Sequence, residues 1–119
     1  MTTDTRSETA ASPSDPVQIE SETHLDEIVA EGGVVLVDFY ADWCGPCQMM
    51  EPSIEALAEE SDATVAKVDV DALQQLASAY GVRGVPTLVV FANGEQVDQQ
   101  VGMLGEDRLF DLVDEYATD

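Results

Sequence analysis

The sequence predicts an α/β fold, a three-layer α/β/α sandwich with a central mixed five-stranded sheet. Strand-like and helix-like segments alternate along the chain in the order βαβαβαββα. Such alternation gives a parallel centre, because each helix crosses over the sheet. The Asn93-Gly94 turn joins the last two strands as a hairpin, which adds an antiparallel edge. With 119 residues, the chain has the length of one domain.

The first two elements are short. Val17–Ile19 is an apolar run that suits a strand. The helix after it is expected to start at Ser21 or Thr23, both good N-caps, and to stop at Gly32-Gly33. Its inner face carries the apolar side chains Leu25, Ile28 and Val29.

The next two elements have the most informative pattern. Val34–Tyr40 (VVLVDFY) is apolar on both faces except at Asp38, which is typical of a strand covered on both sides. A long helix is predicted from Cys44 to Ser61, with Met50, Ile54 and Leu57 spaced to face the core. Pro52 lies inside this helix and should kink it, because proline lacks an N–H.

The remaining strands complete the sheet. Thr64–Val70 (TVAKVDV) is predicted as a strand, and Pro86 opens another at Thr87–Ala92, since a strand tolerates proline at its start. The polar segment Gln96–Val101 suits a sheet edge, because polar side chains discourage pairing with other chains. Two further helices are expected, at Leu73–Tyr80 and from Glu106 to Ala117.

The composition is strongly acidic, with 25 Asp and Glu against four Lys and Arg and a net charge of −21. Such a chain should bind neither nucleic acid nor anionic membranes, because it has few cations to neutralise phosphates. Apolar residues make up 45%, so the charge does not indicate disorder. At 1 M salt the Debye length is about 3 Å, which screens repulsion among the carboxylates. The composition therefore predicts a halophilic host; the alternative is an ordinary acidic protein.

Residues 1–15 are rich in Ser, Thr, Ala and Asp without periodicity, so we expect a disordered polar tail there and one folded domain over 16–119. The tail lacks the apolar region of a secretory signal, and no run approaches the ~18 apolar residues of a membrane span. Two cysteines, three residues apart, do not make a secreted disulfide framework. We therefore expect a cytoplasmic protein.

Cys44 and Cys47 stand between a buried strand and a helix, where open α/β sheets place their sites. At a helix N-terminus, free N–H groups and the helix dipole favour the thiolate of Cys44 over its thiol. Cys47 lies one turn on, close enough for a disulfide that can form and break. Cys44 would attack a substrate disulfide, and Cys47 would then attack the mixed disulfide and release the reduced client.

Asp38 is the lone carboxyl of a buried strand, so desolvation should raise its pKa. A raised pKa fits Asp38 to exchange a proton with Cys47 near neutral pH. The alternative is a satisfied core acid with a purely structural role.

From about Val17 to Ala117 the chain resembles the thioredoxin family. The matching stretches are VVLVDFYADWCGPC, Pro52, AKVDVD, YGVRGVPT, the NG turn and VGML. A C-x-x-C pair alone is a weak indication, whereas WCGPC between a buried strand and a helix, with VPT downstream, is highly specific.

The resemblance implies a role for individual residues. Cys44 is similar to the family's exposed nucleophile and Cys47 to its resolving thiol. Asp38 resembles the buried proton-transfer acid, with Lys67 as its possible partner. Pro86 matches a cis-proline beside the disulfide. The implied client-binding residues are Trp43, Gly45, Pro46, Val85, Pro86 and Gly102.

The resemblance further implies a protein-disulfide reductase that acts on oxidised client proteins as a monomer. A flavin-containing thioredoxin reductase would return it to the dithiol form, and no bound cofactor is expected besides the Cys44–Cys47 disulfide. Two rivals are a disulfide oxidant or isomerase of an oxidising compartment, and a non-enzymatic assembly factor that binds clients in the groove. The Gly-Pro pair between the cysteines resembles the reducing members.

Three features depart from the family pattern. Tyr40 stands where many members have Trp, which should matter little. Gln48 stands where Lys or Arg is frequent, and with Asp42 nearby we expect a less acidic Cys44 thiol. The acidic surface should limit cross-reaction with reductases of other organisms.

Simpler interpretations exist for several side chains. A closed zinc site needs four ligands, and the cysteines with a distant His24 do not supply them, so we expect no metal site and an exposed His24. Lys67 fits a solvated strand lysine equally well, and Trp43 and Met103 fit a cover for the core edge. Met49 and Met50 are expected to pack.

Overall fold

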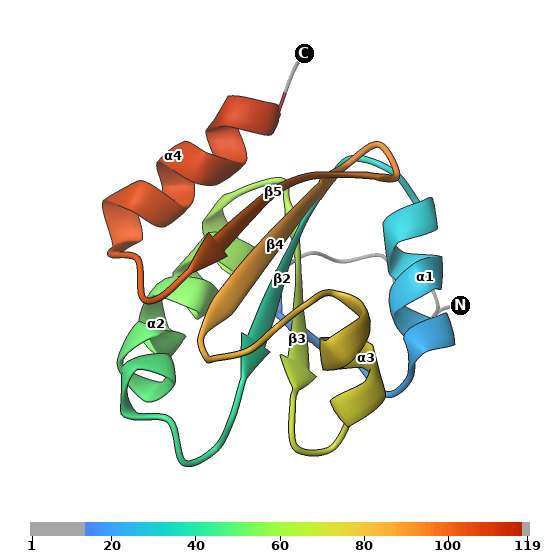
Figure 1. Cartoon of the computed structure of the whole chain (residues 1–119). Coiled ribbons are helices and arrows are strands. Elements are labelled where there is room, and N and C mark those ends of the chain that lie inside the picture. Colours follow the sequence, from blue (N-terminus) through green and yellow to red (C-terminus); the bar gives the residue numbers. More distant parts are fainter. Residues whose placement is uncertain (1–13, 118–119) are drawn as a thin grey trace, which may run out of the picture.

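The computed structural model describes residues 14–117, and its elements follow the predicted order (Figure 1). The strands are β1 (Val17–Gln18), β2 (Val34–Tyr40), β3 (Thr64–Asp69), β4 (Thr87–Ala92) and β5 (Glu95–Val101). The helices are α1 (Glu22–Ala30), α2 (Gly45–Glu60), α3 (Gln74–Ala79) and α4 (Glu106–Tyr116). The part of the expected tail that precedes Ser14 lies outside the described residues.

The sheet has five strands in the order β1-β3-β2-β4-β5. β1, β3 and β2 pair in parallel, and the β4–β5 hairpin joins β2 in antiparallel pairing. This confirms the parallel centre and the antiparallel edge. β4 runs antiparallel to β2 and follows the connection that contains the short helix α3.

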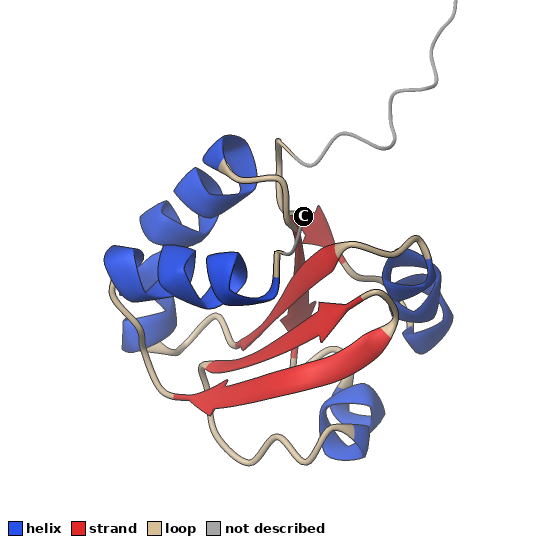
Figure 2. Cartoon of the chain, turned by 90° about the horizontal axis from the view of Figure 1, so that it is seen from above, coloured by secondary structure: helices blue, strands red, loops and turns tan. Residues whose placement is uncertain are grey.

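Helices cover both faces of the sheet, which confirms the three-layer sandwich (Figure 2). On one face, α2 and α4 bury Ile54 and Leu109 against strand residues that include Leu36 and Leu88. On the other face, α1 and α3 bury Leu25 and Leu76 against strand residues that include Val37 and Phe39. β2 lies at the centre and is buried from Val35 to Phe39, so its carboxyl end has a rigid position.

Ser21 is the N-cap of α1, which confirms one of the two predicted N-caps. Its Oγ accepts a hydrogen bond of 3.1 Å from the N–H of His24, and Nδ1 of His24 accepts one of 3.0 Å from the N–H of Glu20. This reciprocal arrangement resembles a capping box. It holds His24 half-buried against the chain, so the expectation of an exposed His24 is wrong.

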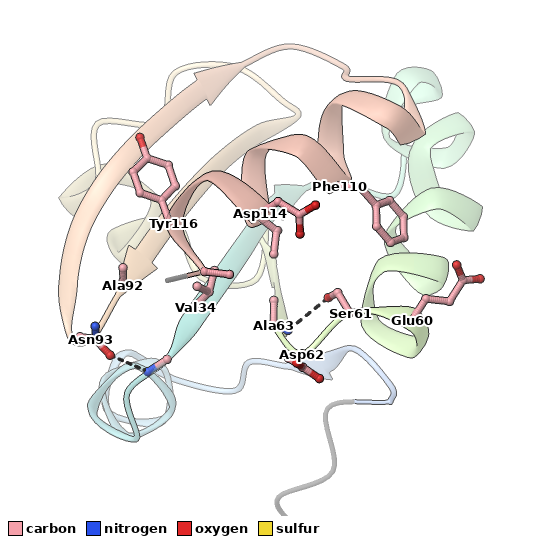
Figure 3. Close-up of a pocket in the computed structure, with 13 residues that line it drawn as sticks. Val34, Glu60, Ser61, Asp62, Ala63, Ala92, Asn93, Phe110, Asp114 and Tyr116 are labelled. Carbon is pink, nitrogen blue, oxygen red and sulfur yellow. Dashed lines mark hydrogen bonds between the residues drawn. The ribbon is translucent and has the colours of Figure 1, made fainter. Parts of the chain in front are cut away.

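A pocket of about 530 Å³ lies between α4, the start of β2 and the end of β4, at the end of the sheet away from the cysteines (Figure 3). Phe110 and Tyr116 line it together with the acidic Glu60, Asp62 and Asp114. Asn93 closes one side, where its Oδ1 accepts a 3.2 Å hydrogen bond from the N–H of Gly33. Neither cysteine lines this pocket, so the redox chemistry lies at the opposite end of the sheet.

Candidate active site

Cys44 and Cys47 form a disulfide at the start of α2, with their Cα atoms 5.2 Å apart. Cys44 is the N-cap in an extended conformation (φ −86°, ψ 110°), and its Sγ accepts a 3.1 Å hydrogen bond from the N–H of Cys47. Pro46 occupies the first turn, where its missing N–H would have had no helical partner. The Cys44 sulfur therefore lies where the free N–H groups and the helix dipole stabilise negative charge.

Both cysteines are buried, with 3% of Cys44 and 4% of Cys47 exposed. The implied exposure of Cys44 is therefore wrong for this disulfide form. Ala41 is buried with the cysteines, and Tyr40, Val70 and Val85 pack against this cluster. The neighbouring residues therefore limit access to both sulfurs in this disulfide form.

The Val85–Pro86 peptide bond is cis, as the resemblance implied. The carbonyl oxygen of Pro86 accepts a 2.8 Å hydrogen bond from the N–H of Gly102. Gly102 has a φ of +101°, a conformation that residues with a side chain rarely adopt. The loop that contains Val85 and Pro86 is thus hydrogen-bonded to the loop that contains Gly102, beside the disulfide.

Trp43 is 71% exposed, so it does not cover the core. Its Nε1 donates a 2.9 Å hydrogen bond to Oδ2 of Asp71, which fixes the indole beside the disulfide loop. Met50 packs in the core as expected, but the packing expectation for Met49 is wrong, because Met49 is exposed. Val101 and Met103, on either side of Gly102, are exposed as well.

Sequence reasoning missed Val101 as part of this surface. The available signal was an apolar residue at the end of an otherwise polar edge strand, directly before a glycine.

Asp38 is 1% exposed, and its Oδ1 has no hydrogen-bond partner. Burial raises the pKa of Asp38 from 3.8 to about 7; the charge of Lys67 lowers it and that of Glu51 raises it further. The predicted shift and its cause are confirmed. The interpretation as a satisfied core acid is not, because a satisfied carboxyl would have partners for both oxygens.

Lys67 is the register partner of Asp38 on the neighbouring parallel strand. Its Nζ lies 2.5 Å from Oε2 of Glu51 and 4.5 Å from the centre of the Tyr40 ring, and its side chain is 13% exposed. Lys67 is therefore a packed and paired cation rather than a solvated strand lysine. Sequence reasoning missed Glu51, although it lies one helical turn after Cys47 and so on the same side of α2.

Gln48 extends over the disulfide loop, where its Nε2 donates a 2.6 Å hydrogen bond to the carbonyl oxygen of Asp42. A pocket of about 350 Å³ opens next to Cys47. Its lining residues are Tyr40, Ala41, Asp42, Cys47, Gln48, Glu51 and Lys67. The pocket therefore connects Cys47, Glu51 and Lys67 with solvent, whereas Asp38 does not line it.

Two further observations concern residues 14–117. They contain no group of three or more His, Cys, Asp and Glu side chains that could hold a metal ion. No helix among them has the length and apolar character needed to cross a membrane.

An N-capping cysteine paired with a second cysteine, at the end of a central strand that carries a buried acid, defines a thiol–disulfide oxidoreductase. The thioredoxin family model matches residues 15–115. The chain belongs to the thioredoxin family. In this family the cysteine pair, rather than a bound cofactor, carries the redox chemistry, and the protein is a protein-disulfide reductase.

Individual relatives agree with this assignment. A thioredoxin of Chlamydia muridarum is 43% identical over 101 residues, which cover 84% of this chain and 98% of that protein. A thioredoxin of Chlorobaculum thiosulfatiphilum is 44% identical over 92 residues, covering 76% and 85%. Among solved structures, a single-site mutant of the thioredoxin from Halobacterium salinarum has a TM-score of 0.88 and 59% identity, covering 92% of this chain and 97% of that one. This neighbour supports the halophilic host predicted from the composition.

Proposed function

We propose that the protein reduces disulfides of client proteins with Cys44 as the attacking thiolate, Cys47 as the resolving thiol and Asp38 as the proton-transfer group. The hydrogen bond from the N–H of Cys47 to the Cys44 sulfur carries the assignment of roles, because it favours negative charge on Cys44. Cys47 lies within the first turn of α2 rather than at the N-cap, so its sulfur does not have the position that favours negative charge.

The reaction transfers two electrons from the dithiol to the client. The Cys44 thiolate attacks one sulfur of the client disulfide, which forms a mixed disulfide and releases the first client thiolate. The ionised Asp38 carboxylate then takes the proton of Cys47, directly or through a water molecule. Cys47 attacks Cys44, the Cys44–Cys47 disulfide forms, and the second client thiolate leaves.

The surface around the disulfide is suited to an extended client segment. Trp43, Val85 and the exposed Val101 and Met103 offer apolar contacts on both sides of the buried sulfurs. Gly45, Pro46, Pro86 and Gly102 complete the client-binding residues that the resemblance implies; Gly45 and Pro46 are exposed, whereas Pro86 is buried. A thioredoxin reductase would use the same surface to return electrons to the disulfide.

Three finer points complete the proposal. The protein acts in the cytoplasm, where a reducing pool keeps dithiols available. It acts as a monomer. The thioredoxin domain spans residues 16–119, and all residues given a role in the reaction lie within it.

Reduction of insulin by dithiothreitol, followed by turbidity in a buffer of high KCl, tests the function. The wild-type protein should accelerate the reaction, and Cys44→Ser should abolish the acceleration because no attacking thiolate remains. A Glu55→Gln variant, exposed on the outer side of α2, serves as a control and should stay active. Full activity of Cys44→Ser would contradict the proposal and favour the non-enzymatic assembly factor.

A further inference from the structure

Lys67 and Asp38 lie on the same face of the sheet, beneath α2. Side chains alternate along a strand, and Leu36 and Val65, two residues before Asp38 and Lys67, both belong to the core cluster that includes α2. The two residues are direct neighbours in the β2–β3 register. A lysine in this position is well placed to stabilise the ionised form of Asp38.

The ammonium group of Lys67 is nevertheless directed to α2. It forms an ion pair of 2.5 Å with Oε2 of Glu51 and lies over the ring of Tyr40. Oδ1 of Asp38 has no hydrogen-bond partner at all. Glu51 and Lys67 line the same pocket as Cys47, and Asp38 is the register neighbour of Lys67.

From these contacts, and given the proposed role of Asp38 in proton transfer, we propose that Glu51 is a positioning residue for the reaction of Cys47. By pairing with Lys67, Glu51 holds the ammonium group away from Asp38 and so keeps Asp38 able to hold and release a proton near neutral pH.

The charged and titratable groups around Asp38 come from three elements. Lys67 lies on β3, Glu51 and Cys47 lie on α2, and Tyr40 lies on β2 itself, with its hydroxyl accepting a hydrogen bond from Gln18. The register partner on β4 is the uncharged Leu88. Neutralising Glu51 removes one negative charge and frees Lys67, and both changes favour the Asp38 carboxylate.

Titration of the Asp38 carboxyl by carbon-13 NMR, in the oxidised protein and at one fixed KCl concentration, tests the inference without any activity assay. The cysteines do not titrate in this form. Glu51→Gln should lower the titration midpoint of Asp38 by about 0.5 to 1 pH unit. The matched control Glu55→Gln removes the same charge from an exposed position one turn along α2 and should leave the midpoint unchanged.

Repeating the Glu51→Gln change in the Lys67→Gln protein separates the effect of the Glu51–Lys67 ion pair from the effect of the Glu51 charge itself. In Lys67→Gln, the Glu51→Gln shift should fall to less than half, because no ammonium group remains to be released. An equal Glu51→Gln shift with and without Lys67, or an equal shift in the Glu55→Gln control, would overturn the inference. Either result leaves the disulfide-reductase function intact, since only an active Cys44→Ser variant contradicts that function.

Discussion

The role proposed for Asp38 in proton transfer comes at a cost to the stability of the fold. A carboxyl group inside a sheet must either stay protonated or ionise with little solvation, and burial raises the pKa of Asp38 from 3.8 to about 7. Oδ1 has no hydrogen bond to offset this cost. The chain keeps the acid next to the helix that carries Cys47, where a group that changes protonation near neutral pH is useful.

Replacing Asp38 with Asn should stabilise the fold above neutral pH. The unfolded chain ionises Asp38 near pH 3.8, whereas the folded chain keeps it protonated up to about pH 7, so wild-type stability falls between these values and stays reduced above them. Asp38→Asn should therefore gain about 2 to 4 kcal/mol at pH 8 and nothing at pH 3.5. Urea unfolding of both proteins at the two pH values measures the difference. An equal difference at both would show that the carboxyl ionises normally.

Gln48 gives a second prediction at this scale. Its side chain lies beside Cys47 and donates to the carbonyl oxygen of Asp42, so a lysine there would bring a cation to the disulfide loop. Gln48→Lys should let Cys44 ionise at lower pH, measured by thiolate absorbance of the reduced protein. Gln48→Met removes the hydrogen bond without adding charge and should not produce that shift. Equal curves for the lysine variant and the wild type would contradict the prediction.

The sequence alone identified Cys44 and Cys47, because they stand between a buried strand and a helix. It identified Asp38 because a lone carboxyl in a buried strand is unusual. It did not identify Glu51, which lies 16 residues from Lys67 and meets it only when α2 packs on β3. The burial of the cysteines was also missed, since it depends on Val85 and Val70, which reach the disulfide from other loops.

Among the elements, the loops around Pro86 and Gly102 are hydrogen-bonded to one another beside the disulfide. The hydrogen bond from Gly102 to the carbonyl oxygen of Pro86 connects the end of β5 to the start of β4. Gly102 has space around it, with no heavy atom within 4 Å of an added Cβ, so only its φ of +101° requires glycine.

Gly102→Ala should therefore destabilise the fold by about 1 to 2 kcal/mol through backbone strain. Gly84 is a matched control, because it also has open space around it, belongs to the same region and lacks the left-handed conformation. Gly84→Ala should change stability by less than about 0.5 kcal/mol. Thermal unfolding of the two variants measures the contrast. Equal losses would show that the conformation of Gly102 is not the cause.

The order and type of the elements followed from hydrophobic period and turn residues. The strand order could not be derived from these signals, because pairing between β1 and β3 or between β2 and β4 depends on contacts distant in sequence.

For the whole molecule, net charge is the dominant electrostatic property. A charge of −21 on 119 residues makes the folded state repel itself in dilute buffer. The pocket between α4 and β2 adds three carboxylates on one side of the molecule (Figure 3). The sequence predicted the charge but not this pocket, because its lining comes from α2, α4 and two strands.

The melting temperature should rise markedly as KCl increases from about 0.1 to 1 M, since the Debye length falls from about 10 to 3 Å. A variant with Glu27, Glu55 and Glu59, all exposed, changed to Gln should melt higher in low salt and show a smaller rise. Parallel rises in both proteins would assign the effect of salt to something other than carboxylate repulsion.

In the proposed reaction, Cys44 attacks the client disulfide and Cys47 resolves the mixed disulfide. The most direct measurement is mass spectrometry of mixed disulfides formed when reduced Cys47→Ser and reduced Cys44→Ser meet an oxidised client at high KCl. The client should be covalently trapped on Cys44 in the first variant, whereas the second variant should trap almost none. Predominant trapping on Cys47, with little on Cys44, would contradict the assignment of the helix N-terminal sulfur as the nucleophile.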